Sequence, residues 1–227
     1  MKLLKVIVFL IITIAVYANC KSYRQHEKWE KISNQRMYSV SGLVDHKNGF
    51  LIVHDNKKEN QPRISFFKHN KISSLIWPDS SLPYDLEAVS IIPSFKNQYI
   101  LMESTGKCYK IKIEQRNNQI TLMNIFQLET NEGVNLEGCL IVKGNFGYKI
   151  IYGDRGSDLR KSTLFVGDFN PINNNITNLV KHIIDLPAPS EHKRNIADLG
   201  IDKKIIYGHP PLQILGTMVL LRPTFIN

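Results

Sequence analysis

The sequence predicts an all-β fold: a β-propeller of four-stranded blades that follows an N-terminal signal helix. Short apolar or alternating segments recur along the chain, turn residues separate them, and no segment after the N-terminus keeps helical periodicity. Similar segments also return, beginning at Ser41, Asp85, Asn135 and Ala197, at intervals of 44, 50 and 62 residues. Each interval has room for about four strands, as propeller blades have. The chain supplies about 3.5–4 blades, so we expect an incomplete circle.

Residues 1–19 are expected to be an export signal. Residues 1–5 carry positive charge, and residues 6–18 are apolar but short for a helix that spans a bilayer. Two kinds of cleavage fit the end of this segment: after Ala18, or before Cys20 as in bacterial lipoproteins. Cys20 is thus a candidate lipidation site and the expected means of any membrane association. We expect an extracytoplasmic protein that is secreted, periplasmic or lipid-anchored to the cell envelope.

The blades are expected within residues 36–208. Each repeat begins with a small or polar residue, continues as an apolar strand, turns, and returns as a second strand that ends in a polar residue. Turn signals such as DHKNG and GNFG favour antiparallel hairpins over parallel units. Residues 209–227 form an atypical tail, because a Pro-Pro pair and an apolar run replace the expected strand pair. Further strands are predicted at GFLIVHD, RISFFKH, QYILMES, KCYKIKIE, QITLMNIFQL, YKIIYGD and STLFVGDF.

The composition indicates an ordinary globular interior and a basic surface. The formal charge is 29 − 20 = +9, and the basic residues are scattered. A solvated basic surface explains this pattern; attraction to a small anionic or phosphorylated ligand, or to an anionic envelope, is the alternative. No nucleic-acid-binding motif is present. Cys108 and Cys139 lie outside any CxxC or Cys/His cluster, so we expect buried thiols, although an exported protein can also bridge them.

The repeated heads DLEAVSII and NLEGCLIV place carboxylates at the start of otherwise apolar strands. In a propeller the innermost strands line a central channel, where such heads converge. Like charges there raise one another's pKa unless a cation neutralises them. Asp85, Glu87, Asn135 and Glu137 are therefore candidate ligands for Ca²⁺ or Mg²⁺, which prefer oxygen ligands, or for a substrate. The alternative is that each glutamate accepts backbone N–H groups of the neighbouring blade and fixes its register.

The segments SGLV, DLEAVSI, YILMESTGKCYKI, NLEGCLIV and RNIADLGID, in that order, resemble a family of bacterial extracytoplasmic propellers. This family comprises the phytase-like esterases and the related SdiA-regulated proteins, and the resemblance covers roughly residues 41–202. It implies a multi-bladed propeller and an esterase activity. Ala88 departs from the pattern, because the family has glycine there. The motif positions fall on Ser41-Gly42, Asp85, Glu87, Glu103, Glu137-Gly138 and Asp198.

Two functions of different classes follow. The first is an envelope propeller that binds a small anionic or phosphorylated ligand, or an envelope protein, at its channel mouth. The second is a metal-assisted phosphoester or ester hydrolase, in which Glu87 and Glu137 hold the cation and Arg155 orients an anionic group. The candidate substrate-binding residues are Arg155, Glu103 and Asp154. No catalytic residue is identified, because the chain has no G-x-S-x-G nucleophile motif.

Overall fold

A computed structural model describes residues 32–114, 117–157, 160–184, 196 and 198–200. These residues form twelve strands in three four-stranded sheets, and all neighbouring strands are antiparallel. Their only helical element is the single 3₁₀ turn η1 (Arg36–Tyr38), and none of their helices is long and apolar enough to cross a bilayer. The predicted all-β fold is confirmed. The predicted export signal, Cys20 and the tail lie outside the described residues.

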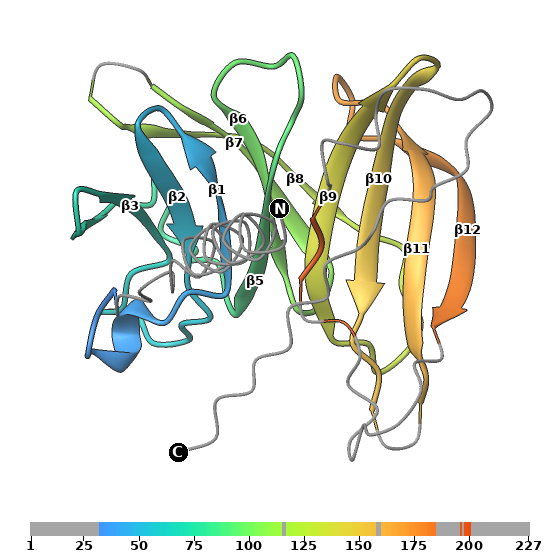
Figure 1. Cartoon of the computed structure of the whole chain (residues 1–227), viewed down its shortest axis with the longest axis horizontal. Helices are drawn as coiled ribbons and strands as arrows, with labels where there is room; N and C mark the ends of the chain where they lie inside the picture. The colour runs from blue at the N-terminus through green and yellow to red at the C-terminus, as the bar shows by residue number, and fades with distance from the viewer. Residues whose placement is uncertain (1–31, 115–116, 158–159, 185–195, 197, 201–227) are drawn as a thin grey trace, which may run out of the picture. The chain divides into compact units, whose positions relative to one another are not determined.

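The three sheets follow one another along the chain, and within each sheet every strand pairs with the next one (Figure 1). The first sheet contains β1 (Gly42–His46), β2 (Gly49–Val53), β3 (Ile64–Lys68) and β4 (Lys71–Ser74). The second contains β5 (Leu86–Ile91), β6 (Gln98–Glu103), β7 (Lys107–Ile113) and β8 (Ile120–Gln127). The third contains β9 (Leu136–Gly144), β10 (Gly147–Asp154), β11 (Ser162–Phe169) and β12 (Ile176–Ile184).

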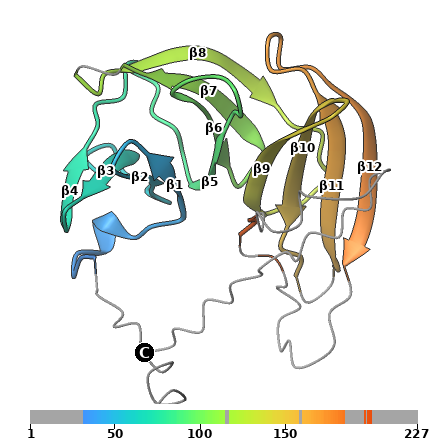
Figure 2. The same ribbon diagram turned by 45° about the horizontal axis from the view of Figure 1, so that its top comes forward.

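The first strands of the three sheets, β1, β5 and β9, lie side by side (Figure 2). Each begins directly after one of the repeated heads, so the repeat that the sequence shows is the repeat of the sheets. Serine side chains tie these strands together. The Ser41 hydroxyl donates to the Leu86 carbonyl at 2.6 Å, and the Ser90 hydroxyl accepts from the Ile141 amide at 2.8 Å.

The first three strands of the second sheet are buried on both faces, which explains why β5 and β6 are nearly continuous apolar runs. Successive side chains of a strand point to opposite faces of its sheet. In β6, Tyr99 and Leu101 accordingly pack in the core shared with the first sheet, whereas Ile100 and Met102 pack in the core shared with the third. Cys108 and Cys139 are both free thiols buried in this second core, as expected. Burial raises the pKa of both thiols.

The outer face of the third sheet is covered by the start of the next repeat. Ile196 and Leu199 complete a core with side chains of β10 and β11. Two glycines leave room for this segment: a Cβ atom at Gly138 would lie 2.7 Å from Leu199 Cγ, and one at Gly153 would lie 2.7 Å from Ile196 Cγ2. A side chain on either glycine would force the segment to shift. Ile196 and Leu199 therefore pack closely on the third sheet.

The outermost strands β4 and β12 were not among the predicted strands. Their side chains are mostly exposed, and neither strand has an apolar face of the usual alternating kind. The sequences KISS and ITNLVKHII carry polar and charged residues that suit the edge of a sheet, where charges hinder pairing with another chain. An alternating hydrophobic pattern arises where one face of a strand is buried, and β4 and β12 bury too few side chains to show it.

Candidate functional site

Glu87 and Glu137 occupy equivalent positions near the starts of β5 and β9. Each is the extra residue of a β-bulge, because the register shifts by one residue at both places. A bulge bends its strand and redirects a side chain out of the regular alternation. The flanking leucines, Leu86 and Leu136, remain in the cores, so the two carboxyl groups sit at the strand heads without disturbing the apolar packing.

The Glu87 carboxyl group is half-buried and surrounded by other carboxyl groups. Burial first, and then the charges of Glu137, Asp85 and Asp55, raise the pKa of Glu87 to about 8, against a lowering by Arg155. Glu137, Asp85 and Asp55 therefore lie near enough to Glu87 for their charges to act on it. At neutral pH the Glu87 carboxyl group is largely protonated, and a cation nearby would favour its ionised form.

Each carboxylate that neighbours Glu87 already has a basic partner. For Glu87 itself, no hydrogen bond or ion pair to another residue is found in the described part of the chain. Glu87 thus differs from its three neighbours in forming no ion pair there, although the charges of Arg155, Arg36 and Lys57 act on it at longer range. The three ion pairs are Arg36–Asp55 at 3.0 Å, Lys57–Asp85 at 3.0 Å and Arg155–Glu137 at 2.5 Å.

Arg155 is held at the head of β9 by two residues. Its Nη1 donates to Glu137 Oε1, and with the Asn135 amide oriented so that its oxygen faces the guanidinium, Nε and Nη2 both donate to that oxygen at 2.9 Å. Asn135 and Glu137 therefore bind an arginine of their own sheet. The Arg155 side chain is 31% exposed, so an anionic group from solvent can still reach it.

Asp85 has a left-handed backbone conformation, with φ at 60°. Asp and Asn adopt this conformation more readily than other non-glycine residues, because their short side chains bond locally. The Asp85 carboxylate accepts from the Ser104 hydroxyl at 2.8 Å, and its carbonyl accepts from the Ser104 amide at 3.1 Å. Asp85 thus suits the backbone bend that precedes β5.

Glu103 and Asp154, two of the predicted substrate-binding residues, are buried acceptors at the ends of β6 and β10. Glu103 accepts from the Tyr84 amide at 2.8 Å and from the Tyr109 hydroxyl at 2.5 Å. Asp154 accepts from the backbone N–H of Asn135 at 3.1 Å, and it forms an ion pair with Arg160 through two hydrogen bonds. Both carboxylates anchor the backbone just before the neighbouring first strand. Glu103 and Asp154 thus accept backbone N–H groups within their own sheets.

The described residues contain no group of three His, Cys, Asp or Glu side chains that is placed to hold a metal ion. Of the predicted ligands, Asp85 is engaged by Lys57, and Asn135 and Glu137 are engaged by Arg155. A metal ion at this place would have to displace these cations. The arrangement does not fit a preformed metal cage, and it leaves Glu87 as the group that can accept a positive charge.

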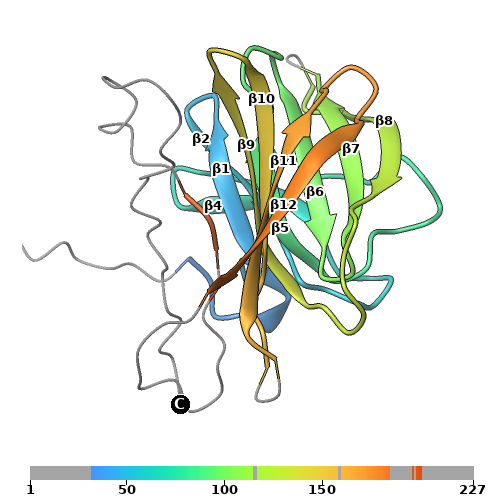
Figure 3. The same ribbon diagram turned by 90° about the vertical axis from the view of Figure 1, so that its right-hand side faces the viewer.

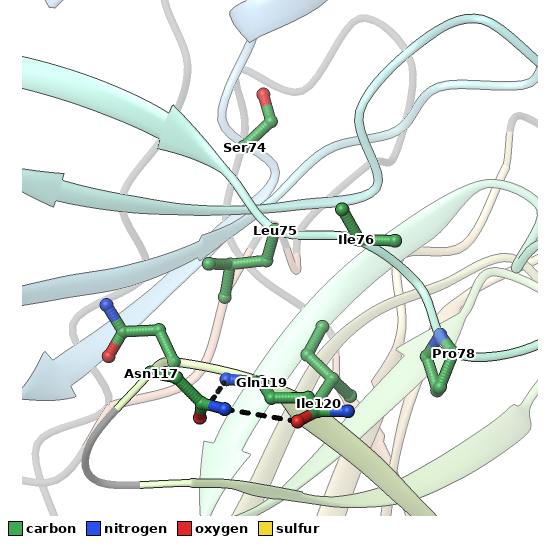
Figure 4. A pocket seen from close by; sticks show the side chains of 8 residues that line it. Ser74, Leu75, Ile76, Pro78, Asn117, Gln119 and Ile120 are labelled. Carbon is green, nitrogen blue, oxygen red and sulfur yellow. Dashed lines mark hydrogen bonds between the residues drawn. The ribbon is translucent and has the colours of Figure 1, made fainter.

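The sequence pattern missed Arg36 and Lys57, the partners of Asp55 and Asp85. Arg36 begins the 3₁₀ turn η1 and Lys57 lies in the loop between β2 and β3, so neither periodicity nor a repeated motif indicates them. A hollow of about 420 Å³ was also missed; it lies beside the end of β4 and contains none of the predicted site residues (Figure 4). Ile76 borders it and is 90% exposed.

No protein-family model matches the chain, and no curated protein is similar to it. The resemblance to phytase-like and SdiA-regulated propellers accordingly stays a prediction.

Proposed function

We propose that the chain is part of an exported β-propeller protein that binds a ligand at its strand heads, with a positively charged group of the ligand placed against Glu87. The observation that carries this proposal is the half-buried Glu87 carboxyl group, which has three carboxylate neighbours and no counter-ion of its own among the described residues. Propellers host many functions, so the fold alone does not indicate a function for this protein.

The propeller assignment is supported by the way the sheets repeat. Each sheet has four strands in sequence order, and its first strand lies beside the first strand of the next sheet. Blades of a propeller have this order, with the innermost strands at a common axis. Ile196 and Leu199 continue the series, because they pack on the third sheet where the innermost part of a fourth blade would lie.

The ligand chemistry follows from charge. A buried carboxylate is costly unless it is paired, and like charges nearby add to that cost. A divalent cation or a protonated amine at Glu87 would remove both costs. Arg155, still partly exposed beside Glu137, offers a contact for an anionic group on the same ligand. The site thus suits a small ligand that carries both charges, such as a phosphorylated compound with its counter-cation.

Cation binding predicts a change in thermal stability. Ca²⁺, Mg²⁺ or a short diamine at about a hundred times its Kd should add about 2.7 kcal/mol to the folded state. This corresponds to a rise in Tm of about 5–10 °C. Glu87→Gln should abolish the rise, and the comparison of metal ions, chelator and diamine by thermal unfolding identifies which kind of cation binds.

Asp168→Asn is the matched control, because Asp168 is an exposed carboxylate that pairs with Lys149 away from the strand heads. This variant should keep the full rise. A wild-type Tm that ignores all three cations, or a rise that persists in Glu87→Gln, would refute cation binding at this site.

Export predicts where the protein is found. A reporter fused to residues 1–25 should leave the cytoplasm, since these residues have the charge and apolar pattern of a signal peptide. If Cys20 carries a lipid, Cys20→Ser should move the mature protein from the membrane fraction to the soluble fraction. Fractionation with immunoblotting measures both. Retention of the reporter in the cytoplasm would contradict export, and unchanged partitioning would favour cleavage after Ala18.

A hydrolase is the second candidate, and one observation favours it. A carboxyl group whose pKa lies near 8 suits a general acid at neutral pH, and Arg155 lies near enough to affect it. Turnover of p-nitrophenyl phosphate or p-nitrophenyl acetate by the wild type, lost in Glu87→Gln and kept in Asp168→Asn, would favour this function over binding alone.

A further inference from the structure

Two hairpin turns of the third sheet expose large apolar side chains at their tips. Phe146, in the turn between β9 and β10, is 96% exposed, and Ile172, in the turn between β11 and β12, is 80% exposed. Both turns stand at the same end of the sheet (Figures 1 and 3). Glu87 and Glu137 lie at the starts of β5 and β9, so this end is opposite to the strand heads.

The two tips belong to one surface. Phe146 and Ile172 border the same hollow, whose volume is about 490 Å³ and whose lining includes Phe95, Tyr148 and Phe169. We call the residues at 94–97, 143–148 and 170–175 the tip surface. Its apolar side chains come from three separate turns, so their proximity is a product of the fold and not of a local sequence run. Exposed apolar side chains such as Phe146 and Ile172, bordering one hollow, are typical of an interaction site.

The turns are held in place by lysines. Lys110 is buried, and its Nζ donates to the Pro171 carbonyl at 2.5 Å, which fixes the β11–β12 turn against the second sheet. Lys143 Nζ donates to the Ser94 hydroxyl at 3.1 Å and joins the β9–β10 turn to the β5–β6 turn. These two hydrogen bonds fix the positions of the turns that carry Phe146 and Ile172.

The tip surface is also positively charged. Lys96 and Lys143 are exposed there, and Lys149 is balanced by Asp168 through an ion pair at 2.6 Å. Apolar tips with exposed lysines beside them match the layers of an anionic bilayer, in which apolar groups enter the acyl boundary and lysines meet the phosphates. A second protein copy would bring the same lysines against one another, which disfavours self-pairing at this surface.

We propose that the tip surface docks the protein on the surface of a bilayer rich in anionic phospholipid, with Phe146 and Ile172 inserted at the interface. The fluorescence of a tryptophan placed at the tip reports contact with lipid at that place alone, whatever holds the rest of the chain. Because Phe146 is almost fully exposed, Phe146→Trp leaves the core unchanged. Ile76→Trp is the matched control, since Ile76 is 90% exposed beside the other hollow.

The full-length wild type, Phe146→Trp and Ile76→Trp are mixed with vesicles of brominated phosphatidylcholine that contain or lack brominated phosphatidylglycerol. Phe146→Trp should lose at least half of the fluorescence that it gains over the wild type, and only with the anionic vesicles. Ile76→Trp should lose none. Adding Ile172→Ser to Phe146→Trp should raise the vesicle concentration needed for half quenching about tenfold, because one buried apolar side chain is removed.

Three outcomes would overturn the proposal. Equal quenching of both tryptophans would show that lipid contact is not specific to the tip surface. Equal quenching by neutral and anionic vesicles would remove the role of the lysines. A blue shift of the Phe146→Trp emission with rising protein concentration and without vesicles would assign the surface to a second copy of this chain.

Discussion

Replacement of Asp154 by alanine is expected to lower the free energy of unfolding by about 3 kcal/mol. The Asp154 side chain is fully buried at the end of β10 and pairs with Arg160 through two hydrogen bonds. It also accepts from the amides of Asn135 and Gly156. Alanine leaves these two N–H groups without an acceptor and removes the partner of Arg160. A single domain is stable by about 5–15 kcal/mol, so this loss is large.

Chemical denaturation of the wild type and three variants measures this effect. Asp154→Asn keeps an acceptor for the backbone but loses the charge, so about half of the loss is expected. Asp168→Ala removes an exposed ion pair with Lys149 and should cost less than about 1 kcal/mol. An Asp154→Ala protein as stable as Asp168→Ala would show that Asp154 does not anchor the head of β9.

The sequence predicted the interior strands well for a physical reason. β6 and β7 bury both faces, and their apolar runs, QYILME and KCYKIKI, leave few alternatives to a buried strand. β4 and β12 lie at sheet edges, where solvent replaces a neighbouring sheet and the apolar pattern weakens. The pairing of each strand with the next followed from the short turns between them.

The candidate site was predicted in part. The repeated Leu-Glu pairs indicated that Glu87 and Glu137 are equivalent, and they occupy equivalent bulges. The pattern gave no information on ion pairs, because Arg36 and Lys57, the counter-ions of Asp55 and Asp85, lie outside the strands and distant in sequence from their partners. The sequence pattern also does not distinguish carboxylates that accept hydrogen bonds from the backbone from carboxylates that can still bind a ligand. Burial makes that distinction: Glu103 is 6% exposed and fully engaged, whereas Glu87 is half-buried without a partner among the described residues.

The stability of the protein is expected to fall between pH 5 and pH 8 because of Glu87. The folded state raises the pKa of Glu87 from 4.5 to about 8, so within this window it keeps a proton that the unfolded chain has lost. Its contribution is complete below pH 4.5 and is lost as the pH rises through about 8. Because water reaches the half-buried carboxyl group, we expect the loss to be about 2 kcal/mol.

The measurement is the free energy of unfolding at several pH values for the wild type and Glu87→Gln. Glutamine cannot ionise, so this variant should lack the fall and should be more stable than the wild type at pH 8. The charges that act on Glu87 include those of Glu137, Asp85, Asp55, Arg155, Arg36 and Lys57, and all of them remain in the variant. The difference between the two curves therefore reports Glu87 alone. Parallel curves would mean that Glu87 is ionised and solvated throughout, and a cation would then have no buried charge to compensate. If a cation does bind there, saturating amounts should flatten the wild-type curve, because the ionised form of Glu87 then has its counter-ion.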